Sequence, residues 1–87
     1  MKINISHMKN VVIGWDINVK VDAEGAEKIS DVEVRVNGFP EIRDSPGGLS
    51  SWDQQLTQKG VFPGNNAVDV RVTDQNGTDT NAKQGWS

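Results

Sequence analysis

The sequence predicts an all-β domain in which two antiparallel sheets of six or seven short strands form a sandwich. The first observation is the strict alternation of apolar and polar residues over 68–73, which is typical of a strand with one buried face. The same alternation recurs over 32–37 and 11–21. Turn-forming sequences separate these runs at intervals of about 8–12 residues, which favours a sandwich over a barrel.

Size and composition set the class of protein. The chain has 87 residues, of which 34% are hydrophobic and 24% charged, as expected for one domain with a thin core. Its net charge of −3 comes from 12 acids and nine bases scattered along the chain, which argues against a nucleic-acid partner. There is no cysteine, which excludes disulfides and thiolate metal sites. The longest apolar run, Val11 to Ile13, is too short to cross a membrane, and the first residues of this sequence contain no apolar segment of the length that a secretory signal needs.

The first eight residues allow two interpretations. Residues 2–6 alternate and predict a short edge strand. The tripeptide Ser6-His7-Met8 is instead typical of a cloning remnant, in which case residues 1–7 are vector-derived and the native chain starts at or just after Met8. Residues 1–8 are therefore set apart, and residues 9–87 are predicted to form the single domain.

The strand predicted over 11–21 has the longest alternating pattern in the chain. Its odd positions are apolar and place Trp15 on the core face, in the middle of the Val/Ile layers. Gly14 predicts a bulge or a bend within this strand. Residues 22–28 are turn formers, and the next strand covers 31–37.

Asn37-Gly38 predicts a type I′ turn that returns the chain over 39–43. Pro40 lacks a backbone donor, so this returning strand is expected at a sheet edge. Residues 44–48 form a loop, and 49–58 are ambiguous because Leu49, Trp52 and Leu56 also fit helical spacing. We favour a strand there, since ten residues make a marginal helix and the rest of the chain is β.

The remainder of the chain continues the β pattern. Residues 59–66 contain glycine and proline and form a long connection, and 67–73 form the strand described first. Residues 74–77 turn, and the polar segment 78–83 is expected to be the last strand, at an edge.

This order of segments resembles bacterial immunoglobulin-like domains, close to the fibronectin type III style of sandwich, over residues 11–84. The resemblance is carried by residues 15–22 (Trp-Asp-Ile-Asn-Val-Lys-Val-Asp), 32–38 (Val-Glu-Val-Arg-Val-Asn-Gly), Trp52 and 64–77 (Gly-Asn-Asn-Ala-Val-Asp-Val-Arg-Val-Thr-Asp-Gln-Asn-Gly). It implies a module that occurs in tandem in secreted and cell-surface proteins, adhesins and polysaccharide-degrading enzymes, without catalytic residues to transfer. The chain departs from the family at its start, where the first strand is expected to be missing or replaced by vector residues.

Candidate catalytic and metal-binding residues are sparse. His7 is the only histidine, so it lacks a partner for metal binding or acid/base chemistry. Ser45, Ser50 and Ser51 have no base beside them in the sequence. The loop Asp74-Gln75-Asn76-Gly77 superficially resembles a calcium loop, but turn chemistry explains the same residues. We therefore expect no catalytic residue, no metal and no cofactor.

Three aromatic residues, Trp52, Phe62 and Trp86, are possible ligand-binding residues, because flat exposed rings on a sandwich stack on sugars. The competing interpretation of Trp52 is a core position opposite Trp15. Trp86 lies past the last predicted strand, where it either folds back over the core or is exposed in a linker. Exposure of both tryptophans would favour carbohydrate binding, and burial of both would leave a spacer.

The sequence therefore predicts a non-catalytic interaction or spacer module of a larger secreted or cell-surface protein. A carbohydrate-binding module is the alternative, and a phage or secretion-machine structural domain is a further one. The expected partners are a protein or polysaccharide at the cell surface and neighbouring domains of the same chain, without nucleic acid or membrane insertion. A monomer is expected, although uncovered edge strands could pair with another chain.

Overall fold

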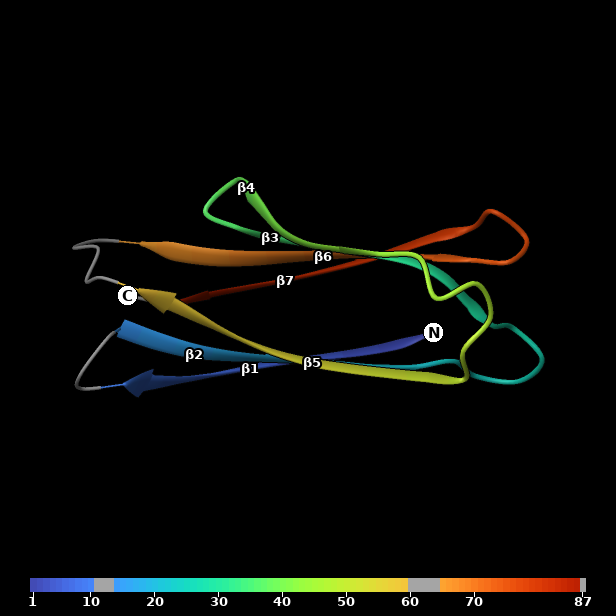
Figure 1. The fold of residues 1–87 in the computed structure, drawn as a ribbon, viewed down its shortest axis with the longest axis horizontal. Coiled ribbons are helices and arrows are strands. Elements are labelled where there is room, and N and C mark those ends of the chain that lie inside the picture. The colour runs from blue at the N-terminus through green and yellow to red at the C-terminus, as the bar shows by residue number, and fades with distance from the viewer. Residues whose placement is uncertain (11–13, 60–64, 87) are drawn as a thin grey trace.

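The computed structural model describes residues 1–10, 14–59 and 65–86, and every element in these ranges is a strand. The strands are β1 (Lys2–Asn10), β2 (Gly14–Asp22), β3 (Ile29–Val36), β4 (Phe39–Asp44), β5 (Ser51–Lys59), β6 (Asn66–Asp74) and β7 (Asp79–Trp86). They form two antiparallel sheets packed face to face (Figure 1). The predicted fold class is confirmed.

The sheets contain three and four strands, in the orders β1-β2-β5 and β4-β3-β6-β7. The chain passes from one sheet to the other between β2 and β3, between β4 and β5, and between β5 and β6. In immunoglobulin nomenclature this order corresponds to strands A-B-E and C′-C-F-G, so the fold is compatible with an immunoglobulin-like domain. The molecule is elongated, with extents of 41 × 19 × 17 Å.

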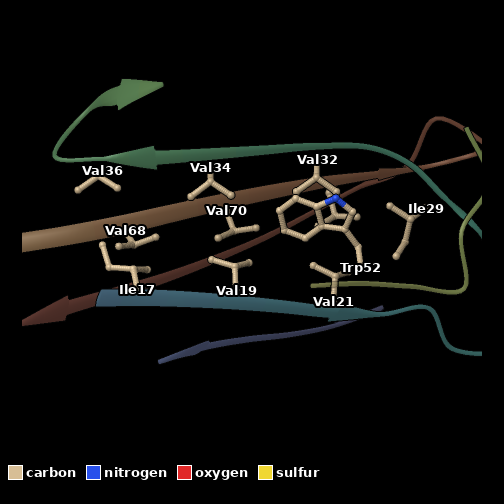
Figure 2. Close-up of a cluster of buried hydrophobic side chains, with 11 residues drawn as sticks. Ile17, Val19, Val21, Ile29, Val32, Val34, Val36, Trp52, Val68 and Val70 are labelled. Carbon is tan, nitrogen blue, oxygen red and sulfur yellow. The ribbon is translucent and has the colours of Figure 1, made fainter. Parts of the chain in front are cut away.

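The core is a double layer of aliphatic side chains between the sheets (Figure 2). Alternate residues of β2, β3 and β6 point inward because side chains in a strand have a period of two, and each fully buried one contributes about 1.5–3 kcal/mol. The buried apolar residues are Ile17, Val19, Val21, Ile29, Val32, Val34, Val36, Trp52, Val68, Val70 and Val72.

The β3-β4 hairpin confirms the predicted type I′ turn. Asn37 and Gly38 have φ angles of 50° and 85°, the left-handed conformation that both central residues of this turn require. Strand β4 is an edge strand, as Pro40 predicted. The pairing shifts between Val34 and Arg35, which is a bulge in β4.

The ambiguous segment 49–58 forms a strand, as favoured. Strand β5 pairs antiparallel with β2 over nine residues without a register shift, and Val21 lies opposite Trp52. Trp52 and Leu56 share the inward face, so the period of two prevails over the helical spacing that the same residues would also satisfy.

Both ends of the chain contribute more structure than predicted. Strand β1 runs to Asn10 rather than to residue 6 and pairs with β2 along its whole length, so a first strand is present. Ile3 and Ile5 pack against the core. Strand β7 is an edge strand, as expected, but it runs to Trp86 rather than ending at Lys83, because the ladder with β6 continues where the sequence has no apolar alternation.

Two predictions for β2 are corrected. Trp15 is on the inward face but at one end of the sandwich and only half-buried, so it is not in the middle of the core. Gly14 begins β2 with a φ of 133°, and no register shift marks a bulge there. The part of the predicted strand over 11–13 lies outside the described residues.

Candidate functional site

Trp52 belongs to the core. Its side chain is buried, with 6% of the residue exposed, between Val21, Val32 and Ile29 (Figure 2). Its indole Nε1 donates a hydrogen bond to Asp44 Oδ2 at 2.8 Å. Trp15 lies six residues before Val21, the residue opposite Trp52, and is therefore about 20 Å away along the strand. The core interpretation is correct, but Trp52 is not opposite Trp15.

Trp86 lies within β7, not past the last strand, and it belongs to a ring cluster at the other end of the sandwich. Its ring stacks on His7 of β1, with centroids 4.8 Å apart and planes at 15°. Trp15 of β2 contacts both rings, each with a centroid distance of 5.6 Å. His7 Nδ1 is 2.8 Å from Gln84 Oε1, whereas the buried Nε1 of Trp86 has no hydrogen-bond partner. This cluster joins the edge strands β1 and β7 of the two sheets.

The three aromatics do not form one surface. Trp52 and Trp86 lie at opposite ends of the sandwich, Trp52 is buried, and His7 covers a face of Trp86. Phe62 lies outside the described residues. Carbohydrate binding through these rings stays a prediction, and the positions of the two tryptophans do not favour it.

The acidic turn residues are used by the turns themselves. Asp74 is 7% exposed, and its Oδ1 accepts hydrogen bonds from the backbone N–H groups of Asn76 at 2.8 Å and Thr78 at 3.0 Å. Asp79 Oδ1 accepts one from the hydroxyl of Thr73 at 2.6 Å. Within 1–10, 14–59 and 65–86, no three histidine, aspartate or glutamate side chains are grouped so as to hold a metal. Turn chemistry therefore accounts for the calcium-loop resemblance.

An ionic cluster that the sequence did not reveal lies on the outer face of the four-stranded sheet. Glu33 of β3 accepts a hydrogen bond from Arg35 Nε at 2.7 Å on its Oε1. Its Oε2 lies 3.2 Å from Arg43 Nε and 3.6 Å from Arg71 Nη2. These are all three arginines of the chain, brought together from β3, β4 and β6.

Strand register explains why this cluster forms. Glu33 pairs directly with Arg43 on one side and with Arg71 on the other, and directly opposed residues on a sheet face are in contact. Glu33, Arg35 and Arg71 thus occupy polar, outward-facing positions of the alternating segments. The sequence alone indicates that these residues face outward. It does not indicate which of them lie opposite one another on neighbouring strands, because that depends on how three strands align.

Electrostatics within the cluster are asymmetric. The Glu33 side chain is 15% exposed and lies under its arginines, whereas the side chains of Arg43 and Arg71 are 66% and 53% exposed. The hydrogen bond from Arg35 holds the pKa of Glu33 below its ordinary value, and the charges of Arg71 and Arg43 add to this effect. The single negative charge of the Glu33 carboxylate is therefore stabilised by three positively charged arginines.

A shallow groove of 360 Å³ lies beside the cluster, over β3, β6 and β7. Its polar lining consists of Glu33, Arg35, Asp69, Arg71, Asn81 and Lys83. Arg71 lies opposite Asn81, and Asp69 lies between Arg35 and Lys83, so two polar rows cross the sheet. We call this surface, together with Arg43, the arginine face.

Comparisons with known proteins add no relative. No family model, no curated protein and no solved structure matches this chain. No helix in the described ranges is long and apolar enough to cross a membrane. The architecture is an all-β, two-sheet antiparallel sandwich, compatible with an immunoglobulin-like domain.

Proposed function

We propose that this chain is an immunoglobulin-like, non-catalytic module of a larger secreted or cell-surface protein, which spaces or presents its neighbours and makes weak protein contacts. The observation that carries the proposal is the course of the chain along the long axis. Strand β1 starts toward one end of the 41 Å molecule, and β7 finishes toward the other (Figure 1). Domains joined before and after it would therefore lie along one line.

The contacts of the polar side chains support the same proposal. His7 is held in a ring stack, Ser45 donates to Asp31 at 2.6 Å, and Ser50 accepts from Lys28 at 2.6 Å. Ser45, Ser50 and His7 thus stabilise local structure at separate places. A spacer needs this kind of stability and no convergent chemistry.

A tandem protein tests the spacer role. Three copies joined by two-residue linkers should give, in small-angle X-ray scattering, a maximum dimension that grows by about the 41 Å length of the domain for each copy. The control has the same three copies joined by flexible 20-residue Gly/Ser linkers, which should give a broader distribution of distances. A short-linked protein no longer than two domain lengths would mean that the copies fold back on one another, and the proposal would fail.

A further inference from the structure

The groove of the arginine face carries a small excess of positive charge on an acidic protein. Three cationic side chains, Arg35, Arg71 and Lys83, lie among two carboxylates, Glu33 and Asp69, a local net charge of +1. Arg43 lies on the other side of Glu33, in a neighbouring hollow that Asp31 and Asp44 also line. The whole chain has a net charge of −3. Gathering every arginine at one point of such a chain concentrates the groups that best recognise carboxylates.

The pairing with Glu33 does not use up these arginines. A guanidinium has five N–H donors arranged as a fork. Arg43 contacts Glu33 through Nε, and Arg71 contacts it through one terminal nitrogen. Both side chains are more than half exposed, so most of their donors face solvent. Exposed ion pairs add little to stability, and one arginine would satisfy Glu33, so the other two are not explained by folding alone.

The spacing of the cations indicates the shape of a ligand. Arg71 and Lys83 belong to neighbouring rows that are two residues apart along the strands, a separation of about 7 Å. Alternate side chains on one side of an extended peptide have the same separation. Two carboxylates placed at positions i and i+2 of such a peptide can therefore meet both rows at once, and Asn81 beside Arg71 adds an amide donor.

We propose that the arginine face binds an acidic, extended peptide segment of a partner protein, with Arg71 receiving one carboxylate bidentately and Lys83 the next. Arg43 contacts Glu33 from the far side, and the Glu33 carboxylate orients the three arginines as their shared acceptor. This proposal does not depend on the spacer role, because a module with an inert surface would still separate its neighbours.

Nuclear magnetic resonance titration of the full chain tests the proposal. The probe is a nine-residue peptide of alternating threonine and glutamate, and the same peptide with glutamine in place of glutamate is the control ligand. At about 50 mM salt, the acidic peptide should shift backbone amide signals of β3, β6 and β7, and its affinity should fall as salt rises. The glutamine peptide should leave these signals in place.

Substitutions separate the site from general charge. Arg71→Gln should weaken binding at least tenfold, and Arg43→Gln severalfold. Lys20→Gln removes the same charge from the exposed outer side of β2, in the other sheet, and should change affinity less than twofold. Arg71→Lys keeps the charge but loses the fork, so it should also bind severalfold more weakly. The control for folding is the amide spectrum of the Arg71→Lys variant without peptide, which should match that of the parent outside the substituted site.

Three results would overturn the proposal. One is the absence of any shift with the acidic peptide. Another is equal weakening by Arg71→Gln and Lys20→Gln, which would show binding to overall charge. The third is binding of polygalacturonate, an acidic polysaccharide, at concentrations at which the peptide leaves the spectrum unchanged.

Discussion

The two ends of the sandwich are each closed by tryptophan, but in different ways. At one end Trp52 is buried and its Nε1 donates to Asp44. At the other end Trp86 is half-buried between His7 and Trp15, and its Nε1 has no partner. We refer to these as the Trp52 end and the Trp86 end. The first combines burial with a matched hydrogen bond, and the second depends on ring packing.

The Trp52 end is also tied by its loops. The backbone N–H groups of Gly47 and Gly48 donate to the carbonyls of Ser30 and Ile29, and Ile29 in turn donates to the carbonyl of Leu49. Ser45 donates a hydrogen bond to Asp31, and the preceding residue, Asp44, accepts the hydrogen bond from Trp52. A buried donor without a partner, such as Trp86 Nε1, costs about 1–3 kcal/mol, whereas Trp52 Nε1 has a partner. We therefore infer that the Trp52 end stabilises the fold more than the Trp86 end does.

The middle of the core sets the scale for this comparison. Val70→Asp should prevent folding, because an unpaired carboxylate would be buried at a position that is 1% exposed. Asp69→Val changes the neighbouring residue on the outer face and should alter the free energy of unfolding by about 0.5 kcal/mol or less. Circular dichroism and urea unfolding measure both. Comparable losses from the two changes would show that the faces of β6 are wrongly assigned.

Truncating the tryptophans compares the ends directly. Trp52→Ala should lower the free energy of unfolding by about 3–5 kcal/mol, since it leaves a large cavity. Trp86→Ala should cost roughly 1–2 kcal/mol, because the ring is only partly buried. Urea denaturation of the two variants gives the values, and a larger loss from Trp86→Ala would reverse the comparison.

Phenylalanine substitutions isolate the indole N–H group. Trp52→Phe removes the donor to Asp44 and should cost about 1–2 kcal/mol. Trp86→Phe removes a buried N–H group that has no partner and should cost no more than about 0.5 kcal/mol. As a control, Asp44→Ala should have almost no additional effect in the Trp52→Phe background. Full additivity there would mean that the hydrogen bond does not contribute.

Acid should weaken the fold through two carboxylates of β3, Asp31 near the Trp52 end and Glu33 nearer the middle of the sheet. Hydrogen bonds from Ser45 and Ser30 lower the pKa of Asp31, and that from Arg35 lowers the pKa of Glu33. A lowered pKa stabilises the fold above the ordinary values of about 3.9 and 4.3, and this contribution is lost as pH falls through the lower, folded-state pKa. Asp31→Asn and Glu33→Gln should therefore be slightly less stable than the parent at pH 7 in urea titrations, and the difference should shrink as the pH falls below the ordinary pKa values. Differences independent of pH would contradict these pKa directions.

Local pattern was enough to predict most of the fold. Alternation fixed which residues of β3 and β6 point inward, and Asn37-Gly38 fixed the hairpin, because both signals act within a few residues. The full length of β7 escaped prediction because its residues are polar. Its pairing comes from β6 and not from its own side chains.

Positions along the strands could not be predicted, because they depend on register between distant segments. The sequence correctly placed Trp15 on the inward face but not at the end of the sandwich. The same limit hid the arginine face, since Glu33, Arg43 and Arg71 meet only when β4, β3 and β6 align as they do. Faces are local properties of a strand, and neighbours across a sheet are not.

The start of β1 and the end of β7 lie toward opposite ends of the molecule, and this has a mechanical consequence. A stretching force applied through neighbouring domains would enter at the start of β1 and leave at the end of β7, parallel to the strands. The hydrogen bonds between β1 and β2 and between β6 and β7 would then be loaded together in shear, rather than peeled apart one after another. This geometry suits a domain that has to transmit tension without opening.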